Sequence, residues 1–198
     1  MKHRLIPLLL TLTLTGCASS PPTHFFTLDP VASSAGPARA GSGAGAKSEP
    51  VKIDAVHIPP ALDRNSMVRG ESDSQLEISS QDRWAGDLGE TIRKVLTQDL
   101  ASRMPSGMVI APESPAPRNA RGLVVEILTF QPQGGEVVLD ADWTLLEGTQ
   151  TNPVLHRSVH LTTAAPATAQ GQATAMSTLL GQLADRMAAE IGGSPRGQ

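Results

Sequence analysis

The chain is poor in cysteine, in aromatic side chains and in clustered positive charge. Cys17 is the only cysteine among 198 residues, so the folded part contains no intramolecular disulfide and depends on its core for stability. Aromatic residues make up 3% of the chain and tyrosine is absent, which argues against platforms for stacking nucleic-acid bases. The formal charge is −3 and no basic cluster occurs, so the electrostatic footprint of nucleic-acid binding is missing as well.

Long apolar runs are also absent. The longest extends from Leu5 to Leu14, about ten residues, whereas a membrane-spanning helix needs roughly twenty. This run follows the basic residues Lys2 and Arg4 and precedes small residues, which is the arrangement of a secretory signal peptide. We therefore expect residues 1–16 to be removed on export, which leaves 14 basic and 19 acidic side chains and a formal charge of −5.

The end of this signal has the pattern of a lipoprotein processing site. Leu14-Thr15-Gly16-Cys17 places a leucine, two small residues and a cysteine in the order that lipoprotein processing enzymes accept. We expect cleavage after Gly16 and acylation of Cys17, which would tie a globular domain to a membrane.

The mature chain is short enough for one domain of ordinary size. We expect a lipidated tether over residues 17–22, a single α+β domain over residues 23–193 and a tail over residues 194–198. Within the domain, sixteen of the twenty residues of the 31–50 segment are alanine, glycine, serine or proline. Such a composition buries little apolar surface, so a flexible loop is predicted there.

Period-2 alternation and β-forming residues predict a series of strands. The strands expected with the clearest patterns are residues 23–28, 51–58, 122–131, 136–146 and 153–163, and a weaker pattern suggests a hairpin of residues 66–69 and 75–79 and a short strand at 108–111. Glycine-rich turns separate the last three long strands, which predicts an antiparallel meander.

Two segments show helical spacing of apolar residues. The first runs from about Arg83 to Arg103, with Trp84 opening its apolar stripe, and the second covers about Ala169 to Ile191. Since helices and strands both have one apolar side, the sequence predicts a two-layer α+β fold, with a mostly antiparallel sheet covered by two amphipathic helices.

No arrangement of residues favours catalysis or metal binding. A Gly-x-Ser-x-Gly nucleophile elbow is absent from the sequence. His156 and His160 are four apart, but on a strand that spacing separates the two side chains by roughly 13 Å, too far to share one metal ion. Asp140 and Asp142 are explained by the exposed side of an alternating strand. We expect neither an enzyme nor a cofactor.

Several separated segments together resemble the PqiC-like family, also described as ABC-type transport auxiliary lipoproteins. The matching segments are Thr23-His24-Phe25-Phe26-Thr27-Leu28, Val56-His57-Ile58-Pro59, Leu62-Asp63-Arg64-Asn65-Ser66-Met67-Val68 and Asp82-Arg83-Trp84-Ala85. Asn65-Ser66 and Phe25-Phe26 depart from the family pattern, which has Pro-Gln and a tyrosine pair at these places.

The resemblance implies a non-enzymatic subunit that docks a periplasmic MCE-domain (PqiB-like) assembly, involved in lipid transport, to the outer membrane. Ala18 fits this location, because release to the outer membrane requires the absence of aspartate after the acylated cysteine. The resemblance suggests partner contacts at Leu62, Asp63, Arg64, Arg83 and Trp84, although a local ion pair within the turn explains Asp63-Arg64 equally well. A scaffold lipoprotein with another periplasmic partner remains an alternative, and so does a homo-oligomer.

Overall fold

The computed structural model describes residues 21–33, 49–72, 75–147 and 152–193. The expected signal peptide with Gly16 and Cys17, most of the predicted 31–50 loop and the 194–198 tail lie outside these residues. The predicted α+β class is confirmed, because the described chain contains two long helices packed on mixed β-sheets.

The larger sheet has five strands in the order β5-β2-β6-β7-β8. Their bounds are β2 Val51–His57, β5 Val109–Ile110, β6 Arg121–Gln133, β7 Glu136–Leu146 and β8 Pro153–Ala164. The pairing of β6, β7 and β8 is the predicted antiparallel meander. Gly134 and Gly135 join β6 to β7 with φ of 60° and 91°, a conformation that favours glycine. By contrast, β2 runs parallel to both β5 and β6.

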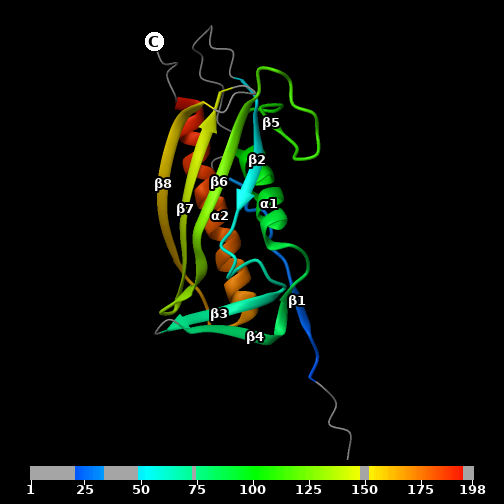
Figure 1. Cartoon of the computed structure of the whole chain (residues 1–198), viewed down its shortest axis with the longest axis vertical. Coiled ribbons are helices and arrows are strands. Elements are labelled where there is room, and N and C mark those ends of the chain that lie inside the picture. Colours follow the sequence, from blue (N-terminus) through cyan, green and yellow to red (C-terminus); the bar gives the residue numbers. More distant parts are fainter. Residues whose placement is uncertain (1–20, 34–48, 73–74, 148–151, 194–198) are drawn as a thin grey trace, which may run out of the picture.

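The smaller sheet has three strands in the order β1-β4-β3, with bounds β1 His24–Phe26, β3 Ser66–Ser72 and β4 Gln75–Trp84. The expected hairpin is formed by β3 and β4, and β1 adds to it in parallel. The small sheet lies across one end of the molecule, below the ends of the long strands in Figure 1. Both sheets combine parallel with antiparallel pairings, and the longest pairings, β6–β7 and β7–β8, are antiparallel, in agreement with the predicted class.

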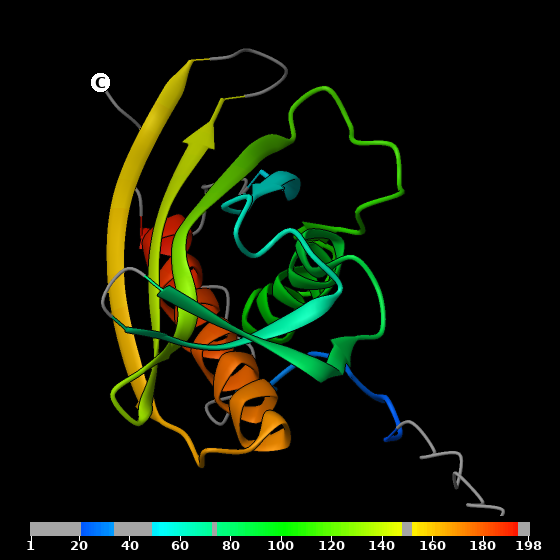
Figure 2. The same cartoon turned by 60° about the horizontal axis from the view of Figure 1, so that its bottom comes forward.

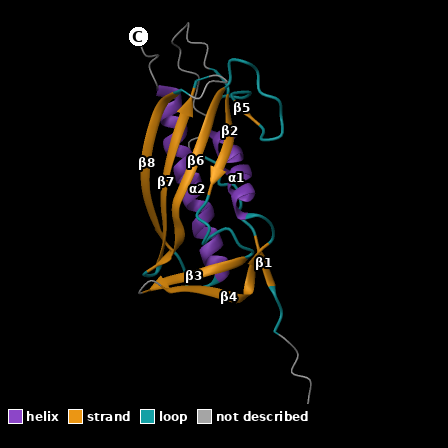
Figure 3. Ribbon diagram, in the orientation of Figure 1, coloured by secondary structure: helices purple, strands orange, loops and turns teal. Residues whose placement is uncertain are grey.

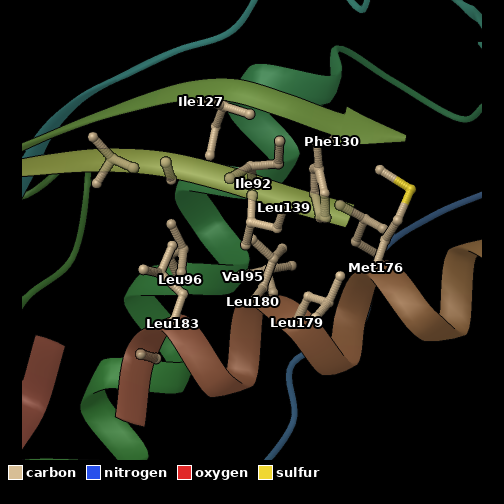
Figure 4. Close-up of a cluster of buried hydrophobic side chains, with 14 of the residues drawn as sticks. Ile92, Val95, Leu96, Ile127, Phe130, Leu139, Met176, Leu179, Leu180 and Leu183 are labelled. Carbon is tan, nitrogen blue, oxygen red and sulfur yellow. The ribbon is translucent and has the colours of Figure 1, made fainter. Parts of the chain in front are cut away.

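Both helices cover the same face of the five-stranded sheet, as Figures 2 and 3 show. They are α1, Leu88–Arg103, and α2, Ala169–Gly193. In the core, apolar side chains of α1 and α2 meet those of β6 and β7 (Figure 4). Leu96, Leu139 and Leu180 are fully buried. Burial of one such side chain contributes about 1.5–3 kcal/mol to folding relative to exposure, so this layer contact accounts for much of the fold's stability.

Helix α1 begins five residues later than the sequence pattern predicts. Arg83 and Trp84 end strand β4, and Asp87 caps the helix by accepting a hydrogen bond of 2.8 Å from the Glu90 amide. Trp84 is buried as predicted, but it belongs to strand β4 and not to the helix, and it pairs with Phe26 of β1. The expected helix start at about Arg83 is therefore wrong, because residues 83 and 84 belong to a strand.

A β-bulge on β6 reverses the side of the sheet to which residues point. Ile127 pairs with Ala141 and Thr129 pairs with Asp140, so Leu128 is the extra residue between them. Before the bulge Val125 and Ile127 point into the core, and after it Phe130 does. The bulge leaves the Leu128 side chain 50% exposed.

The chain that follows β1 packs along the helices. Leu28 is buried, the Asp29 amide donates to Ser177 Oγ of α2 at 3.0 Å, and the Val31 amide donates to Asp99 Oδ1 of α1 at 2.6 Å. Helix α2 accommodates this crossing at Gly181, where a Cβ atom would lie 3.0 Å from that of Val31. Residues 28–31, which follow β1, are thus part of the folded domain.

Candidate functional site

Three segments that are far apart in the sequence meet at one corner of the small sheet. Phe25 pairs with Arg83 in the β1–β4 register. The Ala85 amide donates to the Phe26 carbonyl at 2.8 Å, and the Trp84 amide donates to the Asn65 carbonyl at 2.7 Å. We call Phe25, residues 62–65 and residues 83–84 the β1–β4 corner. It contains all of the residues for which partner contacts are expected.

The loop before β3 is a self-contained turn. The amides of Leu62 and Asp63 both donate to the Pro59 carbonyl, at 2.9 and 3.2 Å. Arg64 Nε donates to the Ala61 carbonyl at 2.7 Å. No ion pair between Asp63 and Arg64 occurs among the described residues, so Arg64 stabilises the turn through the backbone instead of through the neighbouring carboxylate.

The side chains of the corner divide into two groups. Leu62 and Trp84 are buried at 5% and 6% exposure, so they hold the corner against the core and present little surface to a partner. Asp63 and Arg83 are exposed, and Phe25 is 66% exposed. Because strand residues alternate in direction, Phe25 points away from the core while Phe26 packs against it.

A shallow groove of about 350 Å³ borders the corner. It is lined by Pro59, Ala61, Leu62, Leu76, Leu128, Thr129 and Gln131. Sequence reasoning did not find Leu128, because a bulge within a continuous run of β-forming residues leaves no periodic signal. The loop of the corner therefore forms one wall of a groove lined by both apolar and polar groups, and the bulged strand β6 forms the other.

A cluster of charged side chains lies between the two helices, at the end of α1. Arg103 Nε contacts Asp185 Oδ1 at 2.6 Å, and Arg103 Nη1 donates to the Val31 carbonyl at 2.8 Å. Burial raises the pKa of the Asp99 carboxyl to about 6, although the hydrogen bond from Val31 and the charge of Arg103 act in the opposite direction. These contacts fix the chain after β1 to both helices, so the cluster has a structural role.

The outer face of the large sheet carries polar side chains. His160 Nδ1 lies 2.6 Å from Asp140 Oδ1, and His156 Nδ1 lies 3.0 Å from Thr144 Oγ1, each pair joining β7 and β8. The two histidines thus bind separate partners on a strand. Within the described ranges no group of three or more potential ligands is placed to hold a metal ion. Over the same residues, no helix has an apolar stretch of the length that crossing a bilayer demands.

The fold resembles that of solved structures over most of the chain. A crystal structure of an uncharacterised protein superposes with a TM-score of 0.71 and 22% identity, covering 86% of this chain and 99% of that one. A protein from Xanthomonas campestris superposes with a TM-score of 0.62 and 12% identity, covering 86% and 94% of the two chains. At these identities the likeness concerns the fold alone. No curated protein matches the chain significantly.

The family comparison covers residues 62–65 and 83–84 of the corner and most of the helix–sheet core. Residues 26–188 match the model of the ABC-type transport auxiliary lipoprotein component. This range begins in β1 and ends within α2. The resemblance inferred from the sequence is thereby confirmed, and the chain belongs to the family of ABC-type transport auxiliary lipoprotein components.

Proposed function

We propose that this protein is a non-enzymatic lipoprotein of the outer membrane that docks a periplasmic MCE-domain assembly of an ABC-type transport system. Membership of the auxiliary family supports an association with a transporter. The Leu14-Thr15-Gly16-Cys17 sequence supports a lipid anchor, and Ala18 supports delivery to the outer membrane. Docking then requires an exposed surface that is held rigidly relative to the anchor.

The observation that carries the docking role is the groove beside the β1–β4 corner. Its walls come from a turn locked by its own hydrogen bonds and from a bulge that directs a leucine outward. A groove with rigid walls binds with little loss of conformational entropy, since its side chains are already positioned, and Leu62, Leu76 and Leu128 supply its apolar part. This geometry suits an apolar side chain of a partner.

Acidic side chains near the groove indicate the charge that a partner carries at the contact. Asp63 stands next to Leu62, and Glu126 lies two residues before Leu128 on the exposed side of β6. Both carboxylates are exposed, and neither takes part in an ion pair among the described residues. We infer that the docking segment of the partner carries a basic side chain beside its apolar anchor.

Binding of the purified MCE-domain partner tests this proposal. Leu128→Ser should weaken the affinity about tenfold, because removing a well-packed apolar anchor costs about 1–2 kcal/mol. Val154→Ser is the matched control, since Val154 is exposed to the same 50% but lies on β8. Asp63→Ala should lower the association rate and its salt dependence, whereas Glu147→Ala, another exposed acid, should change neither.

Three results would contradict the proposal. The first is a wild-type chain that does not bind the MCE-domain protein, which would favour another periplasmic partner. The second is equal affinity of the Leu128→Ser and Val154→Ser variants, which would move the docking surface away from the groove. The third is a chemical turnover of envelope lipids by the purified chain, which would oppose a non-enzymatic role.

A further inference from the structure

We propose that the paired residues Phe25 and Arg83 of the β1–β4 corner rest on the lipid surface, with the Phe25 side chain inserted at the membrane interface and Arg83 beside it facing the phosphate groups. This orientation is additional to partner docking and rests on the lipid anchor of the proposed function. It would turn a tethered domain into one with a fixed face toward the membrane.

The first argument is the exposure of a large apolar side chain on a rigid strand. Phe25 is 66% exposed although both neighbours in β1 are held by pairing with Asp82 and Trp84 of β4. The chain beyond β1 is fixed at Leu28, so the strand has no freedom to turn Phe25 inward.

The second argument is the distance from the anchor. Phe25 follows Cys17 by eight residues, and an extended chain spans at most about 3.3–3.6 Å per residue, so the two are separated by no more than about 29 Å. An acylated Cys17 therefore keeps Phe25 near the bilayer at every moment. Insertion of the ring then costs little additional entropy.

The third argument is the position of the corner in the whole molecule. The small sheet closes the end of the molecule at which β1 enters, and Figure 2 brings that end forward. Strand β8 begins at the opposite end, beside the end of α2 (Figure 1). Helix α2 runs between these two ends, and its 25 residues make it about 37 Å long. This length exceeds the greatest distance that the chain between Cys17 and Phe25 can span, about 29 Å. Contact with lipid is possible at the corner while the start of β8 stays in the aqueous phase.

The chemistry of the pair fits a lipid interface. Phe25 and Arg83 are paired residues of neighbouring strands, so their side chains leave the same face of the sheet. An apolar ring enters the boundary between head groups and acyl chains, and a guanidinium binds phosphate oxygens at that depth. Arg83 is exposed and has no ion-pair partner among the described residues, so it is free for this contact.

Tryptophan fluorescence in vesicles tests the orientation. The full acylated chain is reconstituted in vesicles of phosphatidylethanolamine and phosphatidylglycerol whose acyl chains carry bromine, a quencher of tryptophan emission. The native Trp84 and Trp143 are 6% and 1% exposed, so the wild-type chain gives the background. The Phe25→Trp variant should show blue-shifted emission, and the brominated lipid should quench most of the emission that the new tryptophan adds to the wild-type background. The Val154→Trp variant is the matched control, and the emission of its new tryptophan should not be quenched.

The outcomes separate the orientation from the anchor. Flotation with the vesicles is measured first, and a chain that stays behind would contradict the lipid anchor and with it this proposal. Equal quenching of Phe25→Trp and Val154→Trp in a chain that does float would overturn the orientation and leave the anchor standing. Adding Arg83→Gln to the Phe25→Trp variant should reduce the blue shift, and an unchanged spectrum would exclude a role for the guanidinium.

Discussion

At the scale of single residues, Asp99 combines an ionisable carboxyl group with complete burial. Its Oδ1 accepts the Val31 amide hydrogen at 2.6 Å, and its Oδ2 has no hydrogen-bond partner. Burial favours the neutral acid, so the pKa rises from about 3.8 to about 6. The residue that fastens the chain after β1 therefore changes its charge within a mildly acidic range.

The raised pKa predicts a specific pH dependence of stability. Between about pH 4 and pH 6 the unfolded chain loses the Asp99 proton while the folded chain keeps it, so the free energy of unfolding falls as the pH rises. The Asp99→Asn variant keeps an acceptor for Val31 but cannot ionise. Relative to this variant, the free energy of unfolding of the wild-type chain should fall by on the order of 3 kcal/mol between about pH 4 and pH 6.

Urea unfolding at pH 4 and at pH 7 checks this prediction. The midpoint of the wild-type chain, compared with that of Asp99→Asn, should be lower at pH 7 than at pH 4. A wild-type advantage that grows with pH would mean that the ionised carboxylate is the stable form and that its contact with Arg103, at 3.8 Å, outweighs desolvation.

At the scale of secondary-structure elements, the start of α1 depends on one cap. Asp87 accepts hydrogen bonds from the Glu90 amide through its side chain and from the Thr91 amide through its carbonyl. A carboxylate at this place also stabilises the positive end of the helix dipole. The cap separates β4 from α1, so Trp84 remains in the strand and its burial anchors the β1–β4 corner.

Replacement of the cap predicts a measurable loss. Asp87→Ala should lower the free energy of unfolding by about 1 kcal/mol, because the first turn loses an acceptor for its free amides. Asp87→Asn preserves the acceptor and should recover most of this loss. Lys94→Ala, at an exposed position within the helix, serves as the control and should lie within about 0.5 kcal/mol of the wild type. A loss equal to that of Asp87→Ala in the control would show that the cap is not the cause.

At the scale of the whole molecule, the segment after β1 connects the expected anchor to the core. Leu28→Ala should destabilise the protein by about 2–5 kcal/mol, because a buried leucine leaves a cavity between the segment and the helices. Phe25→Ala, which alters an exposed side chain of β1 just before this segment, should change stability by less than about 0.5 kcal/mol. Chemical denaturation measures both. Equal losses of stability in the two variants would mean that the segment packs loosely on the helices and does not fix the domain relative to the expected anchor.

The anchor itself has a separate test in cells. Cys17→Ser removes the only thiol of the chain, so the processed lipoprotein cannot form. We expect this variant to accumulate as a precursor or to appear in the periplasmic fraction, and we expect the wild-type chain in the outer-membrane fraction. Fractionation followed by mass spectrometry of the N-terminus distinguishes these forms. Normal processing and membrane recovery of Cys17→Ser would contradict acylation at this residue.

Sequence periodicity determined the elements whose pattern is local. Strand β7 has the predicted bounds, α2 ends two residues beyond the prediction, and β8 ends one residue beyond it. Each of these elements repeats its apolar residues with the period of its own backbone, so a single segment contains the whole signal. The family also followed from local sequence, because short motifs in a fixed order carry the resemblance.

The arrangement of those elements was decided only by the tertiary structure. Strand β2 lies between β5 and β6, and β1 lies beside β4, although no side-chain pattern indicates these partners. Such pairings between distant segments are made by backbone hydrogen bonds. Because almost every residue has the same backbone groups, the side-chain pattern does not show which strands will pair. The bulge at Leu128 and the corner that joins Phe25, Asp63 and Arg83 arise in this way. The sequence thus indicated Asp63 and Arg83 as candidate residues, whereas only the pairing of strands placed the exposed Leu128 and Phe25 beside them.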